Sequence, residues 1–368
     1  MKTKWLFLST GFALFSMFFG SGNLVFPIAV GQESEGHYML AGLGILLTGV
    51  LVPFLGVFGM MLYKGEIASF FSLFGKKGIF IFSLLSLALM GPFGVLARCL
   101  TVAHGALSLL VPNIPLPLAS ALLCGIIFLF TVNKSRIVTM LGMVLTPFLL
   151  GAIGVIAFFG LTDLSPQETL SNHGWEALKN GFFQGYQTMD LLAAFFFSQF
   201  VINHLNSHAD SSMTQKTRLK VFLQASCVGA GILSAVYCSL VLLGWIYSPM
   251  LLNKPPQEML GIIAMESLGS FAAPVVAVAV IFACLTTAIV LTSLFADFLR
   301  KEISRERLQN SHALLITLLI GFSISTLQFS GIAKFLGPIL EATYPALIAL
   351  TMFNIGKKLL VEGTKAQG

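Results

Sequence analysis

The chain has 368 residues, of which 56% are apolar and only 10% are charged, whereas soluble domains carry about 25% charged residues. This composition excludes a soluble enzyme and indicates an integral membrane protein. The formal net charge of +6 comes from basic residues that lie between apolar segments, so we attribute it to membrane topology and expect no nucleic-acid partner.

Apolar segments of about 20 residues recur along the chain, and at 1.5 Å per residue that length crosses the roughly 30 Å hydrocarbon core of a bilayer. We therefore expect an all-α integral membrane protein with about ten transmembrane helices. Their predicted ranges are 5–31, 38–63, 78–110, 115–132, 136–161, 181–206, 219–247, 271–298, 312–330 and 334–356.

Helix-breaking residues interrupt the first predicted span, in the stretch FFGSGNLVFP over residues 18–27. Unwound backbone leaves N–H and C=O groups without partners, which costs several kcal/mol per group in hydrocarbon. A half-helix N-terminus suits a carboxylate, and free carbonyls suit a hard cation. The alternative is that these small residues form a packing motif between helices.

The third span contains Arg98, and charges inside a membrane are costly and usually functional or paired. Its sign is opposite to that of Asp190 in the sixth span. Two interpretations stay open, namely a structural ion pair between them and a contact of Arg98 with a substrate or a gate.

The sixth span opens with NGFFQGYQTMDLL, residues 180–192, in which Gly185, Gln187, Thr188 and Asp190 interrupt an apolar run. Gly22 and Asp190 each lie nine residues from a predicted outer helix end, or about 13 Å at helical rise, near the midplane. Interrupted segments at matching positions in two sets of five helices indicate an inverted-repeat transporter. We expect one transmembrane domain, with repeats over 1–161 and 162–368.

The other candidate reactive residues point away from an enzyme. His204 and His208 have helical spacing, but Leu205 replaces the glutamate of a zinc protease, so we expect a wetted helix end. All five cysteines fall in predicted spans without a C-x-x-C pair, and no disulfide framework or zinc site is expected. No catalytic triad, phosphate loop or carboxylate pair can be assembled, so no enzyme is predicted.

Later segments supply further polar residues. The loop 248–270 has helical spacing, which allows a short helix that caps the outer vestibule. Thr286 and Thr287 of the eighth span either bond back to their own helix or face unwound carbonyls of the first span as sodium ligands. Glu341 either lines the outer half of a pathway or carries a proton.

Basic residues fix the predicted orientation. With the N-terminus inside, most of the 21 Lys and Arg residues lie on the cytoplasmic side, a positive-inside excess that supports an even number of helices. We therefore expect a multi-pass protein of the plasma (inner) membrane with both termini in the cytoplasm.

Four segments in this order, FALFSMFFGSGNLVFP, NGFFQGYQTMDLL, VIFACLTTAIVLT and YPALIAL, resemble the branched-chain amino acid:cation symporter family. This family belongs to the amino acid-polyamine-cation superfamily with the LeuT-like fold. The resemblance runs over essentially the whole chain. It implies two inverted five-helix repeats with broken helices 1 and 6, and uptake of leucine, isoleucine and valine by sodium symport.

The resemblance also implies site residues. Those expected to bind substrate are Ser21, Gly22 and Asn23, as a cradle for the carboxylate, and Gly185, Tyr186, Thr188 and Asp190, as the facing wall that takes the ammonium. Those expected to bind sodium are the carbonyls of Ser16, Phe19 and Ala283 and the hydroxyls of Thr286 and Thr287. Arg98 and Glu341 are candidates for a gate or an ion pair.

Sodium is then a co-transported ion, no organic cofactor is expected, and the partners are an amino acid and the lipid bilayer. Family members usually carry twelve helices, and we expect the ten-helix core to suffice for transport. The alternatives are a symporter of the same fold for methionine or other neutral amino acids, coupling to protons, and a channel or non-transporting receptor. The sequence leaves the oligomeric state open.

Overall fold

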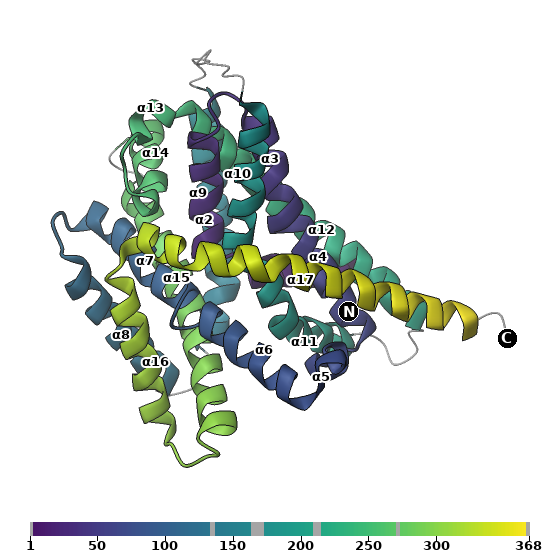
Figure 1. Ribbon diagram of the computed structural model, residues 1–368. Helices are drawn as coiled ribbons and strands as arrows, with labels where there is room; N and C mark the ends of the chain where they lie inside the picture. Colours follow the sequence, from purple (N-terminus) through teal and green to yellow (C-terminus); the bar gives the residue numbers. More distant parts are fainter. Residues whose placement is uncertain (1–2, 133–136, 163–172, 209–214, 270–272, 366–368) are drawn as a thin grey trace.

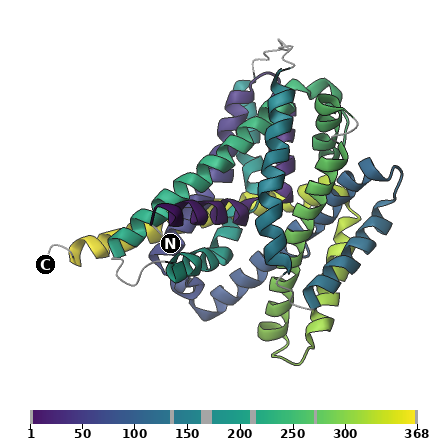
Figure 2. The same ribbon diagram turned by 180° about the vertical axis from the view of Figure 1, so that it is seen from behind.

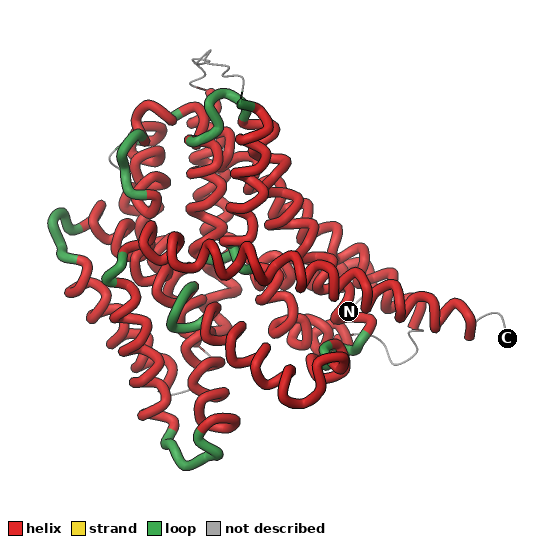
Figure 3. Tube along the Cα trace, in the orientation of Figure 1, coloured by secondary structure: helices red, strands yellow, loops and turns green. Residues whose placement is uncertain are grey.

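The computed structural model describes residues 3–132, 137–162, 173–208, 215–269 and 273–365. All regular elements in these ranges are helical (Figure 3). The first half of the chain contains α1 Thr3–Phe18, α2 Ser21–Gln32, α3 Tyr38–Leu46, η1 Leu47–Leu51, α4 Val52–Leu62, α5 Ile67–Phe70, η2 Ser72–Phe74, α6 Gly75–Met90, α7 Val95–Leu110, α8 Leu116–Val132 and α9 Ile137–Thr162.

The second half begins with another interrupted segment and ends with a long helix that crosses the front of the molecule in Figure 1. Its elements are α10 Gly174–Gln187, α11 Asp190–His208, α12 Gln215–Ile246, α13 Ser248–Leu251, η3 Pro256–Glu258, α14 Met259–Leu268, α15 Ala273–Phe298, η4 Leu299–Ile303, α16 Asn310–Ser325 and α17 Gln328–Lys365.

The all-helical membrane fold is confirmed. By length and composition, five helical segments of the described chain can cross a bilayer, and α1 with α2 forms a further candidate that is bent by 74°. Four shorter apolar helices complete the set. Each predicted span falls on one of these elements, while the number of crossings stays a prediction.

Several predicted spans differ from the structure at their boundaries. The ninth ends at Ser325 and not at 330, because α17 begins at Gln328 and not at 334. The third span is divided into α6 and α7 by a turn at GPFG, residues 91–94, because glycine and proline there end the first helix. The sixth span begins at Gly174 and not at 181, since α10 is amphipathic and its polar residues hide it from an apolar pattern.

The two broken helices pack in equivalent ways. Both α1 and α2 lie along α12, whereas α10 lies along α3 and α11 lies along α4 (Figures 1 and 2). The first predicted span therefore packs on the seventh, just as the sixth predicted span packs on the second. An exchange of this kind is expected of two repeats with inverted orientation.

Glycines bring these helices into backbone contact along two interfaces, which we call the glycine seams. In the seam between α2 and α12, a Cβ added to Gly244 would meet the carbonyl of Ile28. In the seam between α3 and α10, a Cβ added to Gly181 would meet the carbonyl of Ala41. Such close approach allows dense van der Waals packing between the helices. In a membrane this packing matters because the hydrophobic effect does not drive helices together within lipid.

The remaining long helices form a second group, in which α7 packs on α15 and α8 packs on α16. The described ends of α1 and α17 lie on the same side of the molecule in both views (Figures 1 and 2). The segment 248–270 is helical over α14, as its spacing predicted, and α14 packs against α9, α15 and α2.

Candidate functional site

The first break lies at Phe19 and Gly20, between α1 and α2. The Gly20 amide donates to Oδ1 of Asn23 at 3.1 Å. In a continuous helix it would bond to the carbonyl of Ser16, so this carbonyl loses its helical partner. The side chain of Asn23 thus stabilises the start of α2, and Ser21, Gly22 and Asn23 form its first turn. The interruption expected in this stretch thus lies at Phe19 and Gly20, and the three residues expected to cradle the substrate carboxylate are helical.

The second break lies at Thr188 and Met189, between α10 and α11. Met189 adopts the left-handed conformation with φ of 60°, which interrupts the helix between α10 and α11. The Thr188 hydroxyl donates to the carbonyl of Gly185 at 2.9 Å, and the Met189 amide donates to the carbonyl of Tyr186 at 3.1 Å. The carbonyl end of α10 is therefore closed by its own turn.

The two breaks face each other. A Cβ on Gly22 would lie 3.5 Å from Cα of Thr188. Nδ2 of Asn23 lies 2.7 Å from Oδ2 of Asp190 and 2.6 Å from the Tyr237 hydroxyl. The Tyr237 hydroxyl donates in turn to the Asp190 carboxylate at 3.4 Å. We call Asn23, Asp190 and Tyr237 the polar triad.

All three members of the polar triad are buried, and they come from α2, α11 and α12. An unpaired polar group at such a position would be costly, and here the three side chains satisfy one another, while Oδ1 of Asn23 accepts from the Gly20 amide. The Ser21 hydroxyl extends this polar region, since it accepts a hydrogen bond from Cys99 of α7 at 3.4 Å. The triad thus joins both broken helices at one buried point.

Arg98 of α7 does not pair with Asp190 in the described chain. Its guanidinium donates to the main-chain carbonyl of Gln187 at 2.5 Å and to the side-chain oxygen of the same residue at 2.5 Å. It also lies over the rings of Phe26 and Phe329, 4.9 and 5.6 Å from their centroids. Because Gln187 ends α10, the cation meets the negative end of a helix dipole.

The remaining expected wall residues are placed differently. Gly185 packs against η1, where an added Cβ would meet the Thr48 side chain. Tyr186 is buried, and its ring lies 4.7 Å from the ring of Tyr344 on α17. Both residues therefore hold α10 against its neighbours, and only Thr188 and Asp190 of the predicted wall face the first break.

The expected sodium ligands lie on α1, at the first break (Phe19) and on α15. A Cβ on Gly20 would lie 3.7 Å from the methyl group of Thr287, so the first break lies against this threonine. The Thr286 hydroxyl donates to the carbonyl of Ala283 at 3.0 Å, the back-bonding alternative that the sequence left open. Phe19 is buried and its amide completes the last hydrogen bond of α1, to the carbonyl of Phe15.

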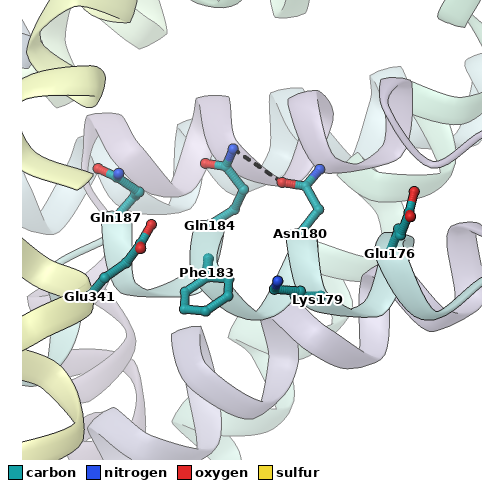
Figure 4. Close-up of a pocket in the computed structure, with 7 residues that line it drawn as sticks. All are labelled: Glu176, Lys179, Asn180, Phe183, Gln184, Gln187 and Glu341. Atoms are coloured by element: carbon teal, nitrogen blue, oxygen red, sulfur yellow. Dashed lines mark hydrogen bonds between the residues drawn. The ribbon is translucent and has the colours of Figure 1, made fainter. Parts of the chain in front are cut away.

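Glu341 of α17 lies away from the triad and lines a pocket of about 330 Å³ together with residues of α10 (Figure 4). Gln187 lines the same pocket. Residues of α14 do not contribute to this pocket, so the capping role considered for the segment 248–270 does not apply to it.

Two residues of the site were not selected from the sequence. Tyr237 lies in an apolar span that also contains Ser234 and Ser239, and nothing in the sequence distinguishes it from them as a site residue. Gln187 is one of the interrupting residues of the second break, but nothing in the sequence links it to Arg98. The side chains of His204 and His208 lie outside the described residues.

Residues 3–367 match the family model described as "Branched-chain amino acid transport protein". The chain is 30% identical to the branched-chain amino acid permease BraB of Bacillus subtilis, over 96% of this chain and 80% of the permease. It is 28% identical to a Staphylococcus aureus protein named as a branched-chain amino acid carrier, over 98% of this chain and 83% of the carrier.

Solved structures show the same fold. An inward-facing structure of Mhp1 has a TM-score of 0.64 and 17% sequence identity, and the match covers 94% of this chain and 75% of that one. A manganese transporter of Eremococcus coleocola has a TM-score of 0.53 at 16% identity, with 95% and 75% of the two chains covered. The fold is therefore that of the LeuT-like transporters.

Proposed function

Because the chain belongs to the branched-chain amino acid transport protein family, we propose that it imports leucine, isoleucine and valine by sodium symport through alternating access. The same proposal places it in the plasma (inner) membrane with both termini in the cytoplasm. It treats residues 1–161 and 162–368 as two inverted repeats of one transmembrane domain.

The observation that carries this proposal is the meeting of the two helix breaks at the polar triad. The first turn of α2, Ser21 to Asn23, carries backbone amides that have no carbonyl partner within the helix, and a helix N-terminus favours an anion. We assign the substrate carboxylate to this turn. The ammonium is assigned to Asp190 and Thr188, which lie across from Gly22.

Sodium is assigned to the other side of the first break. The carbonyl end of α1 carries negative partial charge, and the Ser16 carbonyl is released from helical bonding. Thr287 of α15 lies beside Gly20, and oxygen ligands suit a hard cation. Rotation of the Thr286 hydroxyl away from the Ala283 carbonyl would free two further oxygens for the ion.

Alternating access requires two bodies that move against each other. The glycine seams join the two broken helices to α12 and α3, which favours movement of these helices as one unit. Arg98 belongs to α7 of the second group, and its bonds to Gln187 connect the two bodies. We assign these bonds to a layer that closes the outer side and breaks when the site opens outward.

The energetics are adequate for accumulation. One sodium with a zwitterion moves one net charge, worth about 2.3 kcal/mol per 100 mV. A tenfold sodium gradient adds about 1.4 kcal/mol. Together these terms permit accumulation on the order of 500-fold.

The test is uptake of labelled leucine into liposomes that contain the purified protein, with an inward sodium gradient and then with sodium replaced by choline. We expect accumulation only with sodium. Uptake that follows a proton gradient instead would move coupling to Asp190 or Glu341. Transport of methionine or other neutral amino acids in place of leucine would change the substrate, and conductance without saturable accumulation would indicate a channel.

A further inference from the structure

Two cysteines lie together between α7 and α15, beside the first helix break. Cys99 of α7 and Cys284 of α15 are each 1% exposed, and their thiols are hydrogen bonded to each other. The two helices pack on each other, so the contact is held from both backbones. A disulfide requires two cysteine side chains that meet in this way, and this pair therefore fulfils the first condition for forming one.

The Cys99 sulfur also lies at the start of α2. It is a hydrogen-bonding partner of the Ser21 hydroxyl, at 3.4 Å, and of the Ser21 main-chain amide. The guanidinium of Arg98 interacts electrostatically with the same sulfur. A helix N-terminus and a neighbouring cation are typical surroundings of reactive cysteines, because the thiolate is the nucleophile. A cysteine buried only among apolar side chains is inert by comparison.

We propose that Cys99 and Cys284 form a redox-active thiol pair, which a hydroperoxide such as hydrogen peroxide oxidises to a disulfide. The Cys99 sulfur attacks one peroxide oxygen, so that an S–O bond forms, the O–O bond breaks and one water leaves. The Cys284 sulfur then attacks the Cys99 sulfur, an S–S bond forms, and the oxygen leaves with the thiol proton as a second water. The two thiols lose two electrons, which the peroxide gains, and an added dithiol reverses the oxidation.

Oxidation changes the first turn of α2, to which the proposed function assigns the substrate carboxylate. Peroxide reaches the thiol pair when this turn opens to water. The disulfide draws the Cys99 sulfur towards Cys284 and removes the hydrogen that it donates to Ser21. Ser21 is 1% exposed, so its hydroxyl loses a buried partner. The oxidised protein therefore binds leucine more weakly, a consequence that rests on the proposed function, whereas formation of the disulfide does not.

The first test uses the wild-type protein in lipid nanodiscs, treated with hydrogen peroxide and digested without reduction. Mass spectrometry should find a cross-link between the peptides that contain Cys99 and Cys284, lighter than their sum by two hydrogen atoms and lost after dithiothreitol. The exposed Cys227 reports whether the oxidant has reacted. Unmodified Cys99 and Cys284 beside an oxidised Cys227, or separate sulfinic acids at the two positions, would overturn the proposal.

The second test measures leucine uptake into liposomes before peroxide, after peroxide and after dithiothreitol, with each variant compared with its own untreated rate. At subsaturating leucine, wild-type uptake should fall about fivefold, in line with one lost hydrogen bond, and recover on reduction. Cys99→Ser and Cys284→Ala should not respond to peroxide. The matched controls Cys227→Ser and Cys238→Ser remove exposed thiols of α12 and should respond as the wild type does.

The outcomes separate the two proposals. A cross-link without any change in uptake would refute the effect of the thiol pair on the substrate turn. Peroxide inhibition of Cys99→Ser equal to that of the wild type would assign the inhibition to another residue. Absence of leucine uptake in the untreated protein would overturn the proposed function, while the cross-link would still decide whether the thiol pair is redox-active.

Discussion

The two helix breaks have the same position in the two halves of the chain. They differ in whether the protein itself satisfies the backbone groups at their helix ends. At the second break, the carbonyl end of α10 is closed by its own turn and by Arg98, and α11 begins with the carboxylate of Asp190. At the first break, the Ser16 carbonyl loses its helical partner and the first turn of α2 carries no acidic residue.

This difference indicates that the two breaks have different roles in ligand binding. A helix end that the protein has satisfied internally gains little from a ligand, whereas an unsatisfied end gains the full interaction. The first break therefore fits the proposal that one of its helix ends takes an anion and the other a cation. The second break supplies a wall of fixed shape.

The largest expected effect comes from filling the first break. Gly22→Leu should abolish leucine uptake and binding, because a Cβ at this position already lies 3.4 Å from the Phe26 ring and 3.5 Å from Thr188. The longer side chain must then occupy the space between the breaks. Uptake is measured in liposomes, membrane insertion is checked by the amount of protein in the membrane fraction, and folding is checked by size-exclusion chromatography.

Gly125→Leu is the matched control for that variant. It places the same side chain on α8, at an exposed glycine with open space around it, and should transport normally. Normal uptake by Gly22→Leu would show that the first break does not hold the substrate.

The second largest effect is expected from removing Arg98, the side chain that binds the carbonyl end of α10 at the second break. Arg98→Met should strand the Gln187 carbonyl, which costs about 1–3 kcal/mol for a buried unsatisfied group. We expect a lower melting temperature and uptake reduced about 10- to 100-fold. Arg98→Lys retains the charge and should be less affected, although it loses the two-pronged contact with Gln187.

Thermal unfolding in detergent and initial uptake rates measure these two properties. Equal behaviour of Arg98→Met and the wild type in both would refute the view that Arg98 completes the second break.

A smaller effect is expected at the proposed sodium ligands. Replacing Thr286 and Thr287 together by alanine should raise the sodium concentration for half-maximal uptake about 5- to 30-fold, the equivalent of about 1–2 kcal/mol. The leucine concentration dependence at saturating sodium should change little. Thr326→Ala is the matched control, since its hydroxyl is exposed and bonds only within its own segment. An unchanged sodium dependence in the double variant would remove sodium from this side of the break.

The smallest effect is expected in the polar triad, at Tyr237. Tyr237→Phe removes one hydroxyl while Asn23 still donates to Asp190, so leucine affinity should fall about fivefold, in line with about 1 kcal/mol for one hydrogen bond. Equilibrium binding of labelled leucine checks this value. A complete loss of binding would mean that the hydroxyl itself contacts the substrate.

The sequence located both breaks to within a few residues, because Gly20, Gly22, Thr188 and Asp190 interrupt otherwise apolar runs. It placed the unwinding too late in the first segment, since the Asn23 side chain reaches back to Gly20 and lets α2 start early. The order of residues alone does not reveal this contact, because it forms only when the backbone bends at the break.

Pairing between distant segments was harder to predict. Opposite signs suggested Arg98 with Asp190, but a helix end offers a carbonyl with partial negative charge that the residue letters do not show. Tyr237 was missed for a related reason, because its partners lie 214 and 47 residues away.

Asn23 has a consequence for how the two proposed ligands influence each other. Its oxygen fixes the Gly20 amide beside the proposed sodium side, and its nitrogen contacts Asp190 on the substrate side. One side chain is thus part of both binding equilibria, and thermodynamic linkage requires the coupling to be reciprocal. The factor by which sodium tightens leucine binding must equal the factor by which leucine tightens sodium binding.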